Sequence, residues 1–184
     1  MERYIKTYPK IFSKQECDGI IEYFNIQKIN KNITHTELKD HRHFDEINLN
    51  DFRDETLDTQ MGIYDRFKYV LQQYKEETGL HEHAWPENFK FEEIRLKHYK
   101  TGRGNFLDHV DVGSLDSANR FLVLFVYLND VEKGGETEFP DLDLTISPEC
   151  GTMLLFPSTW TYLHRGNTPI SNDKYILGSY CHYV

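Results

Sequence analysis

The pattern of apolar residues changes near residue 90, and this change constrains the fold more than any other feature. Before it, apolar residues recur with helical spacing; after it, short runs rich in β-branched and aromatic residues alternate with turn residues. Such runs predict strands at 91–99, 106–110, 121–128, 142–146, 152–156, 161–164 and 175–183. Many short strands with regular turns favour a β-sandwich or jelly roll.

Two helices are expected before the change. Ser13 and Glu16 have the spacing of a capping box, and an apolar stripe follows them. A second helix is expected from about Thr59 to Glu77, with Gly79 as its stop. The polar segment 28–58 between them is expected to be a loop with a short strand near 44–49.

These elements predict one α+β, mainly β domain over residues 1–184. Residues 91–184 would form a double-stranded β-helix (jelly roll) core. Residues 1–90 would supply helices packed on one sheet and a polar loop region.

Charge and cysteine content narrow the class further. The chain has 21 Lys and Arg against 30 Asp and Glu, a formal charge of −9, which disfavours binding to nucleic acid or to an anionic membrane. Three widely spaced cysteines form neither a disulfide scaffold nor a thiolate zinc site. With neither a signal-peptide pattern nor a long apolar stretch, we expect a cytoplasmic protein.

Two His-x-Asp triplets are candidates for metal binding. Residues i and i+2 of a strand point to one face, so His109 and Asp111 can offer an imidazole and a carboxylate together. These are two ligands of a 2-His-1-carboxylate triad, which suits Fe(II). His43 and Asp45 have the same spacing, but a solvated loop is the favoured interpretation there. The pair His81 and His83 is also interpreted as a solvated loop.

The triplet at 109–111 has two companions further along the chain. His164 ends a strand-like run and can complete the triad, because a jelly roll brings such strands together. Lys174 opens the final apolar run. A lysine directed into a barrel requires an anion such as a dicarboxylate, and a solvated turn lysine is the equal alternative.

The stretch from about Glu93 to the C-terminus resembles the prolyl 4-hydroxylase group of Fe(II)/2-oxoglutarate dioxygenases. The matching pieces follow in the family's order: Tyr99; His109-Val110-Asp111; Phe-Val-Tyr-Leu-Asn-Asp at 125–130; Gly-Gly-Glu-Thr-Glu-Phe at 134–139; Pro-Glu-Cys-Gly-Thr-Met-Leu-Leu-Phe-Pro at 148–157; His164; and Lys174. Each piece is weak alone, whereas the ordered set is specific.

The resemblance implies a role for each matching residue. It implies that His109, Asp111 and His164 are catalytic residues that bind Fe(II), and that Lys174 pairs with the distal carboxylate of 2-oxoglutarate. It further implies co-substrate contacts from Tyr99, Tyr127 and Thr152, although a packed core aromatic is the alternative for both tyrosines. Arg165 departs from the family's usual small residue after the distal histidine, and is either outward-facing or a substrate contact.

The implied activity is hydroxylation of a peptidyl-proline. It couples conversion of 2-oxoglutarate and O2 to succinate and CO2 with C–H hydroxylation, and ascorbate would support the iron. A peptide or protein substrate is expected, with oligomeric state left open. The alternatives are an oxygenase acting on a non-prolyl substrate such as a nucleic-acid base, and a non-catalytic, cupin-like metal-binding module.

Overall fold

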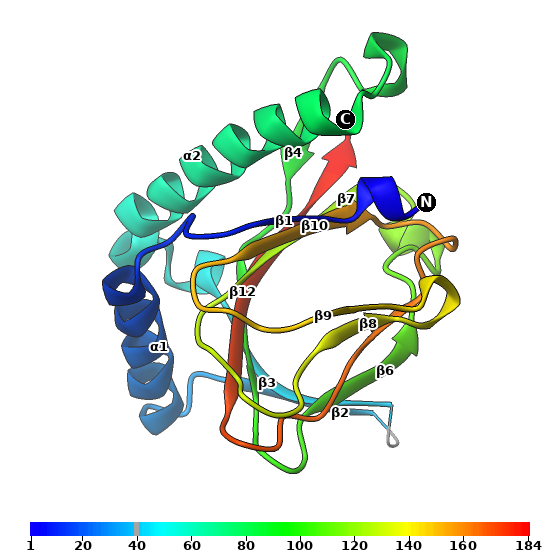
Figure 1. The fold of residues 1–184 in the computed structure, drawn as a ribbon. Helices are drawn as coiled ribbons and strands as arrows, with labels where there is room; N and C mark the ends of the chain where they lie inside the picture. The colour runs from blue at the N-terminus through cyan, green and yellow to red at the C-terminus, as the bar shows by residue number, and fades with distance from the viewer. Residues whose placement is uncertain (39–40) are drawn as a thin grey trace.

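The computed structural model describes residues 1–38 and 41–184 and shows an antiparallel β structure with two helices on one side (Figure 1). Within those residues, twelve strands form one sheet with the order β1-β10-β7-β12-β5-β3-β6-β11-β8-β9, while β2 pairs with β3 and β4 with β12. The strands are β1 (Lys6–Tyr8), β2 (Thr34–Leu38), β3 (Arg42–Asn48), β4 (Phe89–Phe91), β5 (Arg95–Tyr99), β6 (Asn105–His109), β7 (Arg120–Tyr127), β8 (Thr137–Phe139), β9 (Leu144–Ile146), β10 (Met153–Pro157), β11 (His164–Gly166) and β12 (Lys174–Tyr183).

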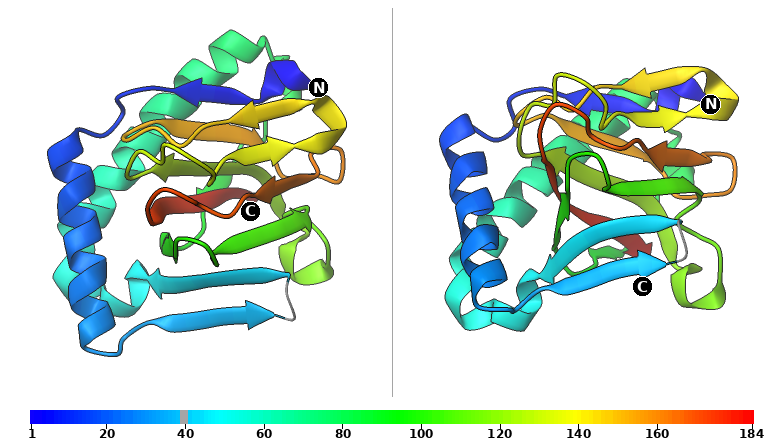
Figure 2. Two further views of the ribbon diagram at one scale, coloured as in Figure 1. Left: turned by 60° about the horizontal axis from the view of Figure 1, so that its bottom comes forward. Right: turned by 90° about the horizontal axis from the view of Figure 1, so that it is seen from below.

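The sheet folds back on itself at β3. This strand pairs with β5 along one edge and with β6 at Arg42 and His43, so the sheet continues from one layer into the other. As a result β6, β11, β8 and β9 lie opposite β10, β7 and β12 around a barrel-like interior (Figure 2). The predicted α+β, mainly β jelly-roll class is confirmed.

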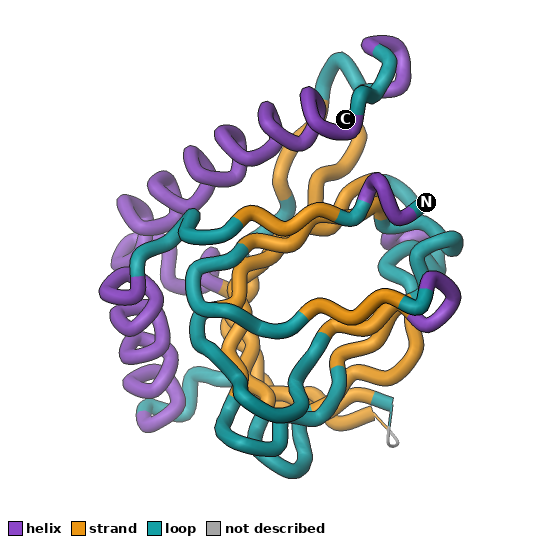
Figure 3. The backbone as a smooth tube through the Cα atoms, in the orientation of Figure 1, coloured by secondary structure: helices purple, strands orange, loops and turns teal. Residues whose placement is uncertain are grey.

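Two helices cover the outer face of the larger layer, α1 (Lys14–Ile29) and α2 (Arg53–Thr78) (Figure 3). The expected capping box at the start of α1 is present: Ser13 accepts from the Glu16 N–H, and the Glu16 carboxylate accepts from the Ser13 N–H. Gly79 ends α2 in the left-handed conformation, as expected. Short 3-10 helices occupy connections of the described chain: η1 (Glu2–Tyr4), η2 (Leu49–Phe52), η3 (Glu82–Ala84), η4 (Leu115–Ser117) and η5 (Pro140–Leu142).

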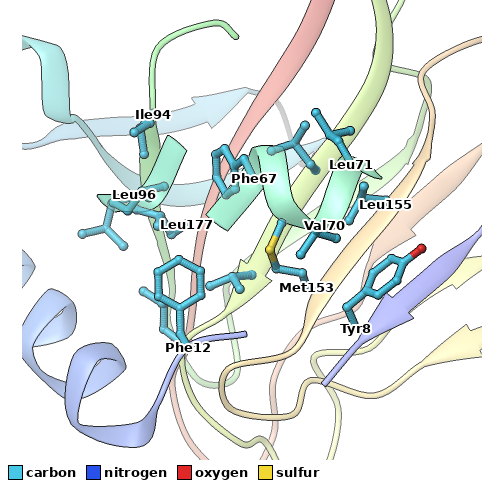
Figure 4. Close-up of a cluster of buried hydrophobic side chains, with 14 of the residues drawn as sticks. Tyr8, Phe12, Phe67, Val70, Leu71, Ile94, Leu96, Met153, Leu155 and Leu177 are labelled. Atoms are coloured by element: carbon cyan, nitrogen blue, oxygen red, sulfur yellow. The ribbon is translucent and has the colours of Figure 1, made fainter. Parts of the chain in front are cut away.

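The core has two parts, one on each side of the larger layer. Between helices and sheet, side chains such as Phe67 and Val70 of α2 pack with Leu155 and Leu177 (Figure 4). Inside the barrel a second cluster includes Phe125, Tyr127 and Phe156. Strand β7 contributes alternate residues to the two clusters. This two-sided burial explains why its sequence after Arg120 is an unbroken run of apolar and aromatic residues.

The predicted loop at 28–58 is wrong in most of its length. Strands β2 and β3 form a hairpin there, and α2 begins at Arg53 rather than near Thr59. The first turns of α2 bury polar side chains. Thr56 donates to the Leu49 carbonyl and Gln60 donates to the same oxygen, so an apolar stripe is absent from the sequence at this point. Among the helices of the described residues, none is both long and apolar enough to cross a bilayer.

Gly151 joins the segment before α1 to the sheet, and it tolerates no side chain. Its φ is +77°, its carbonyl accepts from the Ile11 N–H at 2.9 Å, and an added Cβ would overlap the Phe12 carbonyl oxygen. We expect Gly151→Ala to lower the free energy of unfolding by more than about 2 kcal/mol, measured by urea denaturation. Gly102 is the matched control, because its φ is +73° but its surroundings are open. Equal losses for the two alanine variants would show that overlap with Phe12 contributes nothing.

Candidate active site

Two histidines face each other across paired strands. His109 ends β6, His164 begins β11, and the two are register partners in the antiparallel pair. Asp111 follows two residues after His109. Donor atoms of His109, Asp111 and His164 all lie within 4.8 Å of one another, which makes this the one His, Cys, Asp or Glu cluster of metal-binding dimensions in the described part of the chain. The sequence placed His164 at the end of a strand, whereas β11 begins with it.

Both imidazoles are held in the tautomer that a metal ligand requires. The His109 Nδ1 lies 2.7 Å from the Leu107 carbonyl oxygen, and the His164 Nδ1 lies 3.0 Å from that of Tyr162. A carbonyl oxygen only accepts, so each Nδ1 carries the proton and each Nε2 keeps a free lone pair. Burial, followed by the neighbouring His164, lowers the pKa of His109 to about 3, which keeps this ring neutral.

The carboxylate of Asp111 has one satisfied oxygen and one unsatisfied oxygen. Its side chain is 6% exposed. Oδ1 accepts from the Tyr180 hydroxyl at 2.7 Å, whereas Oδ2 is buried with no hydrogen-bond partner among residues 1–38 and 41–184. This oxygen lies 3.5 Å from the His164 Nε2. A buried, unpaired carboxylate oxygen beside two free imidazole lone pairs is a costly arrangement that a divalent cation relieves. The three residues therefore fit a metal ion.

Lys174 lies buried at the start of β12, opposite Tyr99 of β5. Its Nζ donates to the Gly135 carbonyl at 2.7 Å and lies 5.1 Å from the centre of the Tyr99 ring. Burial lowers the pKa of Lys174 to about 7, although Glu136 opposes this change. The alternative of a solvated turn lysine is excluded by this placement.

A cavity of about 60 Å³ connects the metal-binding residues to the lysine. Its lining includes the triad, Lys174 and Tyr99. Burial raises the pKa of Tyr99, so its hydroxyl stays protonated and able to donate. The same cavity is lined by Thr137, Tyr180 and Lys97, which sequence reasoning did not select.

Tyr127 and Thr152 lie behind this cavity rather than on its wall. The Tyr127 hydroxyl donates to the Thr137 Oγ1 at 2.8 Å, and it is Thr137 that lines the cavity. The Thr152 carbonyl accepts from the Tyr127 N–H at 3.0 Å. Of the four predicted co-substrate residues, Lys174 and Tyr99 are therefore brought together with the triad, and the other two support them from outside.

The other His-x-Asp triplet does not assemble a metal site in the described residues. Asp45 pairs with Lys28 at 2.7 Å and with His35 at 2.6 Å on the outer face of β3. His81 and His83 are exposed, as expected. His98 is buried, and its Nε2 lies 2.7 Å from an oxygen of Asp173.

Arg165 faces outward, which is one of the two alternatives expected for it. Its guanidinium donates to the Glu138 carboxylate of β8 and lies 3.3 Å from Asp108 of β6. These pairs connect the strand that carries His164 to both of its neighbours. The large residue next to a triad histidine thus braces the strands around the site.

Comparison with known proteins agrees with this geometry. Residues 94–182 match the family model described as the 2OG-Fe(II) oxygenase superfamily. Prolyl 4-hydroxylase subunit alpha-1 of Gallus gallus is 27% identical over 107 residues, which cover 50% of this chain. The match covers 20% of that relative, so the chain spans about a fifth of the relative's length.

Solved structures share the fold over almost the whole chain. A viral collagen prolyl hydroxylase from Paramecium bursaria Chlorella virus-1, in complex with 2OG, has a TM-score of 0.76 at 23% identity, covering 98% of this chain and 97% of that chain. A Pseudomonas putida prolyl-4-hydroxylase has a TM-score of 0.70 at 12% identity, covering 98% and 93%. A Trichoplax adhaerens prolyl hydroxylase, in complex with a hypoxia inducible factor peptide fragment, has a TM-score of 0.73 at 12% identity, covering 98% and 84%.

Two histidines and one carboxylate gathered on a jelly roll are a ligand set typical of non-haem iron oxygenases. The order of the three metal-binding residues in the sequence, the cavity that they line and the family match all indicate the same class of protein. Over residues 94–182, just under half of its length, the chain is similar to the 2OG-Fe(II) oxygenase superfamily, and it carries a His-x-Asp…His triad. Its structural neighbours are prolyl 4-hydroxylases. The family and the triad together imply Fe(II) and 2-oxoglutarate as cofactor and co-substrate.

Proposed function

We propose that this protein hydroxylates a prolyl residue within a peptide or protein. The observation that carries the proposal is the cavity shared by the triad and the buried Lys174. The structural neighbours support the choice of substrate class, since they are prolyl hydroxylases and one of them holds a peptide fragment.

The proposed roles follow from the donor groups of each residue. His109 and His164 would offer Nε2 and Asp111 would offer Oδ2 to Fe(II). The metal with 2-oxoglutarate and O2 supplies the oxidising chemistry that hydroxylates a C–H bond and yields succinate and CO2. Ascorbate is proposed to sustain turnover by keeping the iron reduced.

The chain's own groups would bind and orient the co-substrate. Lys174 would hold the distal carboxylate, since a buried cation needs an anionic partner. Tyr99 would donate a hydrogen bond from the cavity wall. Because the Thr137 Oγ1 accepts from Tyr127, its own hydroxyl hydrogen is free to donate into the cavity. Direct co-substrate contacts of Tyr127 and Thr152 stay predictions.

Charge supports a peptide over a nucleic acid as the substrate. A formal charge of −9 gives no general attraction to phosphates. A non-catalytic metal-binding module would give Lys174 no reason to lie in the same cavity as the triad.

A substrate-dependent assay tests the proposal. Protein is incubated with Fe(II), 2-oxoglutarate, ascorbate and O2, together with either a proline-rich peptide or the same peptide with alanine at each proline. We expect the proline peptide to raise succinate formation several-fold and to gain one oxygen atom by mass spectrometry. Equal rates with the two peptides, or stimulation by a single-stranded oligonucleotide instead, would contradict prolyl specificity. Slow succinate formation without any substrate would still identify an oxygenase.

A further inference from the structure

Tyr180 reaches the metal-binding residues from the long strand β12 (Lys174–Tyr183). It lies six residues after Lys174 and therefore on the same face of the strand. Its ring lines the cavity, and its hydroxyl donates to the Asp111 Oδ1 at 2.7 Å. This contact is not part of the motif that identified the triad.

The hydrogen bond makes the two oxygens of Asp111 unequal. Oδ1 is engaged by a neutral phenol, while Oδ2 is buried without a hydrogen bond in the described part of the chain. Oδ2 is also the oxygen that lies 3.5 Å from the His164 Nε2. The donor atoms of the site that have no hydrogen bond in the described residues are thus one carboxylate oxygen and two imidazole nitrogens.

Tyr180 is itself held in place by an arginine. The Arg120 guanidinium lies 3.9 Å from the centre of the Tyr180 ring. Arg120 donates to both oxygens of Glu92, at 2.7 and 2.9 Å, and to the Asp111 carbonyl at 3.3 Å. One cation therefore fixes the tyrosine ring and the backbone of Asp111 together.

We propose that Tyr180 is a positioning residue that presents Asp111 to the metal through Oδ2 alone. The inference rests on the proposed function in one respect, namely that the triad binds Fe(II). Binding through one oxygen leaves coordination positions for the co-substrate and O2, as a facial triad requires. Outer partners of this kind act by fixing the orientation of a ligand and tuning its basicity.

The test measures metal affinity without co-substrate or substrate. Mn(II) is titrated into metal-free protein, and free Mn(II) is followed by electron paramagnetic resonance. Tyr180→Phe removes only the hydroxyl and keeps the ring under Arg120. We expect about 10- to 100-fold weaker Mn(II) binding than in wild type. Tyr175→Phe is the matched control on the same strand, because the Tyr175 hydroxyl contacts Asn25 of α1 instead, and its affinity should equal that of wild type.

A second measurement separates positioning from a general loss of structure. The visible absorption of Co(II)-loaded protein reports coordination number and geometry, and it should change in Tyr180→Phe but not in Tyr175→Phe. Melting temperatures in the presence of a chelator show whether the metal-free variant is folded at the titration temperature. A folded Tyr180→Phe variant with wild-type affinity and spectrum would overturn the inference.

A reference variant, Asp111→Ala, distinguishes a wrong role for Tyr180 from a wrong assignment of the metal site. Asp111→Ala removes the ligand itself. If wild type binds Mn(II) no more tightly than Asp111→Ala does, the metal assignment is wrong, and the positioning role is overturned with it. If wild type binds tightly and Tyr180→Phe does too, only the role of Tyr180 is wrong.

Discussion

Lys174→Met is expected to make the protein more stable and nearly unable to bind 2-oxoglutarate. The Lys174 side chain is 2% exposed and its Nζ donates to one carbonyl oxygen, from Gly135. A buried ammonium with so little compensation destabilises the folded state. Methionine has a similar shape and no charge, so it removes this penalty. The wild-type lysine therefore makes the folded protein less stable, as expected for a residue that is retained for function.

The stability gain should depend on pH in a defined direction. The pKa of Lys174 is about 7 in the folded protein, below the ordinary 10.5. Below pH 7 the lysine is charged in both states, and the folded state bears the full penalty. Between pH 7 and 10.5 the unfolded chain binds the extra proton, so wild-type stability rises with pH. The advantage of Lys174→Met should therefore be largest below pH 7 and vanish near pH 10.5. Its maximum should be a few kcal/mol, because each tenfold loss of proton affinity on folding corresponds to about 1.4 kcal/mol.

Lys174→Met should weaken co-substrate binding, although it should increase stability. Lys174 must be protonated to pair with a carboxylate, so wild-type affinity for 2-oxoglutarate should fall as pH rises above 7. In Lys174→Met we expect the Michaelis constant for 2-oxoglutarate to rise at least 100-fold, about 3 kcal/mol, since a buried carboxylate loses its cation. Urea denaturation across pH and succinate kinetics measure the two effects.

Lys100→Met serves as the matched control, because Lys100 follows Tyr99 but is exposed. It should change neither stability nor the Michaelis constant appreciably. If Lys174→Met is less stable than wild type below pH 7, the side chain is not a buried cation in solution. If its Michaelis constant is unchanged, 2-oxoglutarate is held elsewhere.

Asp111→Ala is expected to abolish turnover and the stabilisation that metal gives. Ligand that binds only the folded state raises the melting temperature according to its concentration and affinity. The variant keeps two imidazoles and loses the buried oxygen that has no hydrogen-bond partner among the described residues. Loss of a ligand should exceed the roughly 100-fold range seen for outer partners. Differential scanning fluorimetry with Mn(II) and the succinate assay with Fe(II) measure both losses.

The second His-x-Asp triplet supplies a control of the same chemistry. Asp45→Ala removes a carboxylate that pairs with Lys28 and His35 on the outer face of β3. It should lower stability modestly, by about 1 kcal/mol, and leave the metal-dependent rise in melting temperature intact. A rise that is lost in Asp45→Ala but kept in Asp111→Ala would move the metal to the other triplet and overturn the assignment.

The sequence was informative where chemistry depends on residue type and order. His109, Asp111, His164 and Lys174 could be selected because metal and carboxylate binding restrict the choice of side chains. Their meeting in one cavity required the fold, since β3 must join two layers before β6 and β12 share an interior. The ordered motif supplied that fold by resemblance.

Sequence reasoning failed where structure depends on pairing rather than on pattern. The hairpin of β2 and β3 has no clear alternation, and backbone pairing to β5 stabilises it instead. Tyr180 was missed although its even spacing from Lys174 places both on one strand face. That period was available, but nothing in the sequence showed that Asp111 lies opposite.

Strand β12 carries both Lys174 and Tyr180, and it therefore sets the distance between them. Lys174 and Tyr180 are six residues apart, about 20 Å of extended chain. Between them Gly178 lies so close to β7 that a Cβ would be 2.6 Å from the Phe125 Cβ. The strand therefore lies tight against its neighbour and cannot bow outward without losing that contact. The distance between Lys174, proposed to hold the co-substrate, and Tyr180, proposed to orient the metal ligand, is thus set by one strand that is packed closely against β7.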